Sequence, residues 1–382
     1  MPHLHPRKID FIFFDAGGGH RSAANALQAV IQEQARPWEI RLVNLQELLD
    51  PLDVFRKITG LRLEDVYNNL LQRGWTLGSR PMLRVMHGVL RFYYRAQVKI
   101  LAEFWRRDTP DLVVSLVPNF NRAMLNGLRG AGATAPYVTI LTDFADYPPH
   151  FWIERQEQYL ICGTERAAQQ ARACGHPDDH ILRTSGMILR PSFYDPPAVH
   201  VATERERLGL KAELPTGLVL FGGEGSKKML DIARRVSAMS APPQLIFICG
   251  RNSALQARLS ALKTPYAKVV EGFTKEIPYY MALSDFFVGK PGPGSISEAL
   301  AMKLPVIVER NAWTLVQERY NADWVEEKQV GVVVHSFARI EQALANLLEP
   351  SRFARFRANV AAVKNRAVFE IPEILERLLA GA

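Results

Sequence analysis

Short β-branched and aromatic runs alternate with longer helical segments along almost the whole chain. The first run, Ile9–Phe14, is followed by a glycine loop and by a helix expected from Ser22 to about Gln34. Such alternation is typical of parallel β-sheets whose strands are joined by crossover helices. The pattern therefore predicts an α/β fold.

A proline-rich stretch, Arg190–Pro197, separates two series of predicted strands. The strands are Ile9–Phe14, Ile40–Val43, Leu112–Leu116, Tyr137–Leu141 and Tyr159–Cys162, then Leu218–Phe221, Leu245–Cys249, Val269–Val270, Phe286–Val288, Val306–Val308 and Val332–Val334. At about 150 residues per domain, a chain of 382 residues has room for two. We predict two Rossmann-like domains, at 1–195 and 196–360, and a C-terminal helix at 361–382 that returns to the first. Ligands bind at the carboxyl ends of such strands, so the site is expected in a cleft between the two sheets.

Composition excludes several classes of protein. Hydrophobic residues make up 48% of the chain, but no apolar run approaches the roughly 18 residues of a membrane span. The cysteines, Cys162, Cys174 and Cys249, are widely spaced and form no Cys-x-x-Cys pair, which disfavours a disulfide framework or a zinc site. No Asp-x-Asp or other metal-ligand spacing occurs. We expect a cytoplasmic protein without metal or cofactor.

The basic residues are concentrated in one segment. Residues 55–107 contain 11 basic and three acidic residues, an excess equal to the formal net charge of +8 of the whole chain. Large apolar residues, among them Trp75, Phe92 and Trp105, are interspersed with these bases. A basic, aromatic-rich amphipathic stretch favours an anionic membrane surface, although a helix pair docked on the core would give the same pattern. No nucleic-acid-binding motif accompanies the charge, so nucleic acid is not expected as a partner.

The first glycine loop links the first predicted strand to the first helix, as Asp15-Ala16-Gly17-Gly18-Gly19-His20-Arg21-Ser22. Three glycines let a ligand approach backbone N–H groups at the positive end of a helix dipole. A dinucleotide fingerprint is disfavoured because Ser22 replaces its third glycine and the second strand ends at Asn44. Asp15 and His20 flank the glycines and are candidates for a general base, although the glycines could also serve the turn alone.

Two more glycine loops follow strands of the second series, as Phe221-Gly222-Gly223-Glu224-Gly225-Ser226 and Gly289-Lys290-Pro291-Gly292-Pro293-Gly294-Ser295. Neither matches the P-loop pattern Gly-x4-Gly-Lys-Ser/Thr. Glycine loops at helix N-termini suit a diphosphate. Ser295 and Glu298 also have the spacing of a helix capping box, which would give Glu298 a purely structural role.

These motifs together resemble one family. Phe14–Ala23 resembles the N-terminal loop of monogalactosyldiacylglycerol synthases and processive diacylglycerol glucosyltransferases, which belong to glycosyltransferase family 28. The nucleotide-sugar domain of this family is similar to a set of C-terminal motifs: Cys249–Asn252, Gly272-Phe273, Met281, Asp285, Gly289–Ser295, Glu298-Ala299, Pro305, Gln317-Glu318, Asn321-Ala322 and Gly331. Thr142-Asp143-Phe144, with His150 and Trp152, resembles an N-domain loop, and Ser185–Phe193 resembles the hinge. The likeness spans nearly the whole chain, and extends more distantly to the peptidoglycan N-acetylglucosaminyltransferase.

The resemblance implies a GT-B fold, a UDP-sugar donor, no metal, and inversion at the anomeric carbon. Position by position, it assigns the diphosphate to Gly222, Gly223 and Ser295, the uracil to the Arg251 and Phe273 regions, the ribose to Glu298, and the sugar hydroxyls to Gln317 and Glu318. Gly292 and Gly294 are also expected to bind the donor. The resemblance assigns the acceptor side to Gly17, Gly18, Gly19 and Asp143, with Asp15 or His20 acting on the acceptor hydroxyl.

The expected activity is transfer of a hexose from a UDP-sugar to a diacylglycerol-type lipid, at the inner face of the membrane. The resemblance does not determine which sugar is transferred. Pro291 stands where the lipid galactosyltransferases usually have alanine, and Arg310–Val316 lacks their usual Pro-Gly. Three alternatives remain: a UDP-N-acetylglucosamine 2-epimerase, a transferase with a non-lipid acceptor, and a non-catalytic nucleotide-sugar-binding protein. The basic, aromatic segment counts against the epimerase.

Overall fold

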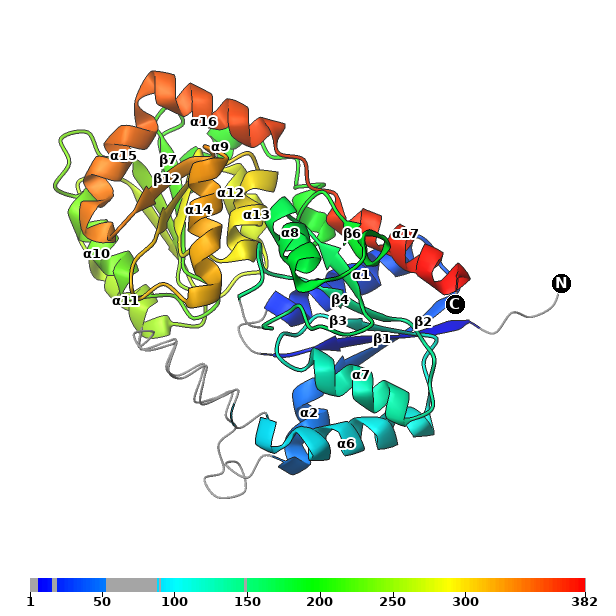
Figure 1. Ribbon diagram of the computed structural model, residues 1–382. Coiled ribbons are helices and arrows are strands. Elements are labelled where there is room, and N and C mark those ends of the chain that lie inside the picture. The colour runs from blue at the N-terminus through cyan, green and yellow to red at the C-terminus, as the bar shows by residue number, and fades with distance from the viewer. Residues whose placement is uncertain (1–5, 16–18, 53–87, 89–90, 148–149, 382) are drawn as a thin grey trace. The chain divides into compact units, whose positions relative to one another are not determined.

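The computed structural model describes residues 6–15, 19–52, 88, 91–147 and 150–381. These residues form two compact units (Figure 1). The first contains the described residues up to Arg190 together with those from Asn365 onward, and the second contains Pro191–Lys364. The chain passes from one unit to the other inside the proline-rich stretch, where fixed φ angles and missing N–H groups prevent a continuous helix or strand.

The first unit is built on a six-stranded parallel sheet in the order β2-β1-β3-β4-β5-β6. Its strands are β1 (Arg7–Phe13), β2 (Trp38–Asn44), β3 (Leu112–Ser115), β4 (Tyr137–Ile140), β5 (Tyr159–Cys162) and β6 (Ile181–Arg183). The five predicted strands are confirmed within a few residues. Sequence reasoning missed β6 because this edge strand has three residues, of which only Ile181 is buried.

Helices cover both faces of this sheet. They are α1 (Gly19–Glu33), α2 (Leu45–Leu49), α6 (Tyr94–Arg107), α7 (Asn121–Gly130), α8 (Glu165–Cys174) and α17 (Ala367–Ala380), with 3₁₀ turns η1 (Asp50–Leu52) and η2 (Asp178–His180). Figure 1 shows α2, α6 and α7 on one face and α1, α8 and α17 on the other. The basic segment of the sequence is described only at residue 88 and from 91 to 107, and the rest of that prediction lies outside the described residues.

The last helix, α17, packs beside α1 in the first unit. The Glu370 carboxylate accepts hydrogen bonds of 2.7 Å from both the backbone N–H and the hydroxyl of Ser185. Arg36 pairs with Glu376 at 2.7 Å. The segment that joins the first unit begins at Asn365, later than the expected residue 361, because α16 (Pro350–Ala362) is part of the second unit.

The second unit has a six-stranded parallel sheet in the order β12-β11-β10-β7-β8-β9. Its strands are β7 (Thr216–Leu220), β8 (Gln244–Ile248), β9 (Lys268–Glu271), β10 (Phe286–Gly289), β11 (Val306–Glu309) and β12 (Gly331–Val334). All six predicted strands are confirmed. Every residue of β7, β8, β10 and β11 is buried, because helices cover both faces of a parallel sheet.

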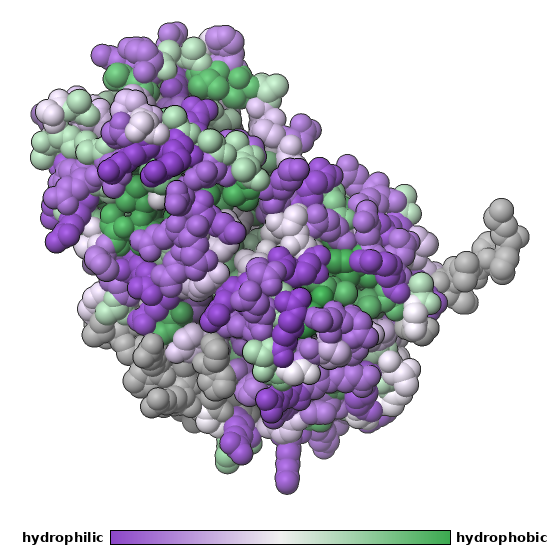
Figure 2. Space-filling view, turned by 45° about the horizontal axis from the view of Figure 1, so that its top comes forward, coloured by the Kyte–Doolittle hydropathy of each residue, from purple (hydrophilic) through white to green (hydrophobic). Residues whose placement is uncertain are grey.

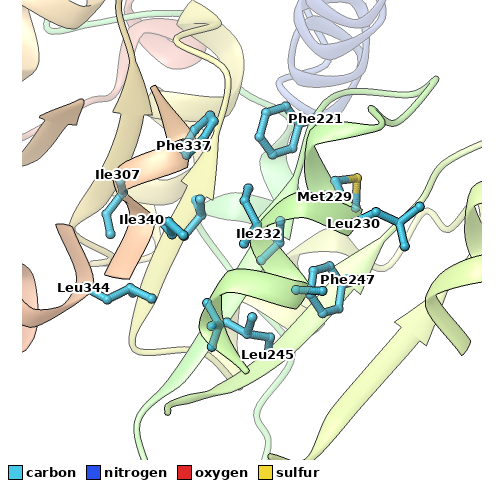
Figure 3. Close-up of a cluster of buried hydrophobic side chains, with 14 of the residues drawn as sticks. Phe221, Met229, Leu230, Ile232, Leu245, Phe247, Ile307, Phe337, Ile340 and Leu344 are labelled. Carbon is cyan, nitrogen blue, oxygen red and sulfur yellow. The ribbon is translucent and has the colours of Figure 1, made fainter. Parts of the chain in front are cut away.

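The helices of the second unit are α9 (Val201–Arg207), α10 (Lys228–Val236), α11 (Ser253–Ala261), α12 (Ile277–Ala282), α13 (Pro293–Ala301), α14 (Arg319–Glu327), α15 (Ile340–Leu348) and α16, with 3₁₀ turns η3 (Pro191–Phe193), η4 (Val316–Glu318) and η5 (Phe337–Arg339). Figure 3 shows a hydrophobic core in which α10, α15 and η5 pack on the sheet. Phe221 and Phe337 meet edge to face there, with ring centroids 5.3 Å apart. This contact anchors the bend after β7.

The surface in Figure 2 is mostly hydrophilic, and its apolar residues are gathered in separate small patches. Within the described parts of the chain, no helix has both the length and the hydropathy to cross a bilayer. In α6, Leu101 and Trp105 are buried in the core, whereas Phe92, just before this helix, is 81% exposed.

Candidate functional site

In both sheets, glycine loops follow strands that lie where the strand order reverses. In the first unit, β2 lies on one side of β1 and β3 on the other, so the strand order reverses at β1. In the second unit, the order reverses in the same way between β7 and β10. Ligands of open α/β sheets bind at such switch points, outside the carboxyl ends of the strands. The glycine loops found in the sequence therefore lie at the expected edge of each sheet.

Asp15 is held by two neighbours at the end of β1. The Arg21 guanidinium forms a two-pronged ion pair with its carboxylate, and the Asn44 amide donates a hydrogen bond of 3.1 Å. Of the adjacent glycines, Gly17 and Gly18 lie outside the described residues. Gly19 is the exposed first residue of α1, and a Cβ added to it would meet no atom within 4 Å. The partners of Asp15 were not identified from the sequence.

His20 lies in the first turn of α1 and reaches the end of β3. Its imidazole is hydrogen-bonded to the backbone carbonyl of Leu116, and its Nδ1 lies 3.3 Å from the Thr142 hydroxyl. The Trp152 ring is 5.9 Å from it, centroid to centroid. Loss of hydration lowers the pKa of His20 to about 4, against a weaker opposing effect of the Leu116 carbonyl. The side chain is therefore neutral at pH 7 and carries a lone pair that can accept a proton.

Asp143, expected on the acceptor side, is buried and contacts Trp152, the neighbour of this histidine. Its carboxylate accepts a hydrogen bond of 2.9 Å from Trp152 Nε1, so it orients the ring that lies beside His20. The same loop is closed by Asp146, whose carboxylate accepts a hydrogen bond of 2.6 Å from the Trp152 backbone N–H. The structure brings Asp143 and His20 together through Trp152. This contact could not be inferred from spacing along the chain.

In the second unit, three residues of the predicted donor site, Gly222, Gly292 and Glu318, lie around Lys290. A Cβ added to Gly222 would lie 3.8 Å from Lys290 Cε, and one added to Gly292 would lie 3.4 Å from the same atom. The Lys290 ammonium pairs with Glu318 at 2.9 Å, and the Glu318 side chain is only 10% exposed. Gly222 has a φ of +77°, which L-residues with a side chain rarely adopt. Lys290, which sequence reasoning quoted only as part of a loop, is thus central to the site.

A second group surrounds the Arg251 side chain. Its guanidinium lies 4.8 Å from the centroid of the Phe273 ring and pairs with Glu224 at 3.3 Å. The Arg251 backbone N–H donates to the Gly223 carbonyl at 2.8 Å, which joins the bend after β7 to the end of β8. Arg251 and Phe273 remain 65% and 56% exposed. They form an open cation–π platform on which a planar base could stack.

The N-terminus of α13 differs from the capping box expected at Ser295. The helix begins at Pro293 with Gly292 as its N-cap, so Ser295 already lies in the first turn and caps nothing. The capping role of Glu298 is therefore wrong. The N–H groups of Gly294 and Ser295 have no intrahelical acceptor, and a Cβ added to Gly294 would meet nothing within 4 Å. This turn can receive an anion.

Gln317, expected at the sugar hydroxyls, precedes Glu318 in η4 and is half-buried. Its side-chain amide forms no hydrogen bond with any residue that the structure describes, so it is available to a ligand. Over the described ranges, no three His, Cys, Asp or Glu side chains are grouped as a metal ion would require. The expectation of a metal-free reaction stays a prediction, as does the cleft expected between the two domains.

The chain is similar in sequence to known proteins. Residues 218–377 match the glycosyltransferase family 28 C-terminal domain. Monogalactosyldiacylglycerol synthase 1 of Arabidopsis thaliana is 29% identical over 366 residues, which cover 91% of this chain and 66% of that protein. The monogalactosyldiacylglycerol synthase of Spinacia oleracea is 28% identical, over 98% of this chain and 73% of its own length. The chain thus spans about two thirds to three quarters of these relatives.

A solved structure shares the fold. MurG of Acinetobacter baumannii superimposes with a TM-score of 0.63 at 11% identity, covering 97% of this chain and 100% of the MurG chain. The two parallel-sheet units are therefore the two Rossmann-like domains of a GT-B fold, as the sequence predicted. Residues 218–377 are similar to the C-terminal domain of glycosyltransferase family 28, and over most of its length the chain is similar to the monogalactosyldiacylglycerol synthases.

Proposed function

We propose that this chain is an inverting, metal-independent hexosyltransferase that moves a sugar from a UDP-sugar to the hydroxyl of a diacylglycerol-type lipid. The observation that carries the proposal is the pair of glycine bends at the switch point of the second sheet, which meet at Lys290 beside the open N-terminus of α13. Backbone N–H groups, a helix dipole and an ammonium group are what a diphosphate requires. Similarity to monogalactosyldiacylglycerol synthases supports the lipid acceptor.

The donor would be held along the carboxyl edge of the second sheet. Its uracil would stack on the Arg251–Phe273 platform, and its ribose would meet Glu298 on α13. The diphosphate would lie over Gly222, Gly223, Gly292 and Gly294, against the first turn of α13 that contains Ser295. The sugar hydroxyls would be bound by Gln317 and Glu318. Because Glu318 is already paired with Lys290, its carboxylate would contact both the Lys290 ammonium and the sugar when the donor is bound.

Proton removal from the acceptor hydroxyl is assigned to His20, with Asp15 in a positioning role. The imidazole is neutral at pH 7, whereas both Asp15 oxygens already accept hydrogen bonds from Arg21. The acceptor oxygen attacks the anomeric carbon and its proton passes to His20. The bond to UDP breaks on the opposite face, which inverts the anomeric centre. The negative charge that develops on UDP is stabilised by N–H groups and by Lys290.

A donor screen tests this function. The chain is incubated with UDP-glucose, UDP-galactose or UDP-N-acetylglucosamine and vesicles that contain diacylglycerol, and the lipids are analysed by mass spectrometry. We expect one donor to yield a hexosyl diacylglycerol and free UDP. Conversion of UDP-N-acetylglucosamine to its 2-epimer without acceptor would instead identify an epimerase. If no donor is turned over, the proposal is contradicted, and the non-catalytic nucleotide-sugar-binding protein is the alternative that remains.

Membrane contact is assigned to the basic segment 55–107, on an anionic surface such as the inner face of the cytoplasmic membrane. In its described part, Arg91, Arg95 and Lys99 are exposed at four-residue spacing beside the exposed Phe92. We expect the chain to sediment with anionic vesicles, and to be released from them by high salt because salt screens surface charges.

Charge-reversal variants test that contact. Arg95→Glu with Lys99→Glu should reduce sedimentation with anionic vesicles, whereas Arg258→Glu with Lys263→Glu, an equal change at exposed positions of the second unit, should not. Binding that ignores lipid charge, salt and both variants would refute the electrostatic assignment.

A further inference from the structure

A second lysine at the carboxyl edge of the second sheet is held by a buried carboxylate. Glu309 is the last residue of β11, and its side chain is 7% exposed. One of its oxygens pairs with the Lys228 ammonium, and the other accepts a hydrogen bond of 3.1 Å from the Phe337 backbone N–H. The Lys228 ammonium also lies 5.9 Å from the centroid of the Phe337 ring. Both carboxylate oxygens of Glu309 therefore have partners.

Lys228 lies next to the predicted diphosphate site. It is the first residue of α10 and follows the glycine bend that begins at Gly222. Its partner Glu309 ends β11, and β10, which is followed directly by Lys290, lies between β11 and β7. The segments that follow two neighbouring strands, β7 and β10, thus each contain a lysine that is paired with a buried glutamate.

The lysine retains hydrogen-bonding capacity. An ammonium group has three donors, of which one is directed at Glu309. The Lys228 side chain is 44% exposed, nearly the same as the 43% of Lys290, so its remaining donors are accessible from solvent. The ion pair restricts the rotamers of a flexible side chain, so little further ordering is needed when an anion binds.

We infer that Lys228 binds the diphosphate of the nucleotide-sugar donor, with Glu309 as the residue that positions it. This inference rests on the proposed function. The two lysines then supply two positive charges to a leaving group that gains negative charge as the glycosidic bond breaks, and Lys228 forms no covalent bond and transfers no proton.

Calorimetry with UDP and with uridine tests the inference. Lys228→Met should weaken UDP binding roughly 10- to 100-fold, the range expected for losing a hydrogen bond to a charged group, while uridine binding is unchanged. Lys228→Arg should restore most of the affinity for UDP. Lys227→Met is the matched control, because Lys227 is the neighbouring residue and is exposed. The Lys227→Met variant should bind UDP as tightly as the unmodified chain does.

A double variant separates ligand contact from structural tethering. Lys228→Met alone leaves Glu309 buried without its cation and should lower the melting temperature, and Lys228→Met with Glu309→Gln should recover much of it. If Lys228 contacts the diphosphate, the double variant still binds UDP weakly. Recovery of UDP affinity in the double variant, or full affinity in Lys228→Met, would overturn the inference. If the unmodified chain does not bind UDP, both the proposal of a UDP-sugar donor and the inference about Lys228 are contradicted.

Discussion

Replacing His20 by alanine should lower turnover by roughly 10²- to 10⁴-fold, the usual contribution of a positioned general base. Binding of UDP should be unchanged, because His20 belongs to the first unit and the donor residues belong to the second. The measurement is the rate of glycolipid formation at saturating donor, with UDP affinity determined separately by calorimetry.

The pH dependence of the same reaction gives a second readout. Burial lowers the pKa of His20 to about 4, so the imidazole is neutral and able to accept a proton above that value. For the unmodified chain, kcat/KM should therefore be insensitive to His20 protonation at neutral pH and should fall only as the pH approaches about 4. An acid limb near the ordinary pKa of histidine, about 6.5, would contradict the burial of the imidazole in the active chain.

Asp15→Asn is the matched variant for the choice between the two candidate bases. The Arg21 ion pair and the Asn44 amide occupy the Asp15 carboxylate, so this variant should lose less turnover than His20→Ala. A larger loss in Asp15→Asn than in His20→Ala would make Asp15 the base. Full turnover in both variants would show that neither Asp15 nor His20 acts on the acceptor hydroxyl.

Replacing Asp10 by alanine should lower the free energy of unfolding of the first unit by about 1–3 kcal/mol, the usual cost of leaving a buried hydrogen-bond donor without its acceptor. Asp10 is completely buried in β1, and its two oxygens accept hydrogen bonds of 2.7 Å from Arg41 Nε and Nη2. Trp105 Nε1 donates a third bond of 2.8 Å. The alanine variant would leave the Trp105 N–H without this acceptor, whereas the Arg41 guanidinium would keep its ion pair with Asp108 at 2.7 Å.

The effect can be measured by urea denaturation, followed by the fluorescence of Trp105 and the other tryptophans. Because the chain has two units, the transition of the first unit must be resolved from that of the second. Arg7→Ala is the control on the same strand: it removes an ion pair with Asp111 in which Arg7 is 52% exposed, so it should cost less than about 1 kcal/mol. Equal effects of the two variants would show that the buried network contributes no more than a surface pair.

The sequence predicted the elements better than it predicted their partners. Eleven of the strands were identified from apolar runs, because buried parallel strands are hydrophobic on both faces and short runs of this kind are distinctive. β6 has too few buried residues to give that signal. The start of α13 was misjudged because Ser295 and Glu298 have capping-box spacing, whereas Pro293 is compatible with the first helical position and Gly292 with the N-cap.

Local order in the sequence determined where the glycine bends, Asp15, His20 and the donor motifs lie along the chain, since strands, turns and helix starts depend on neighbouring residues. The tertiary structure decided which of these groups meet: His20 with Leu116 and Trp152, Lys290 with Glu318, and Lys228 with Glu309. These partners are brought together by strand order and helix packing. Periodicity along the chain carries no information about strand order, because parallel strands of similar hydrophobicity could be arranged in several ways.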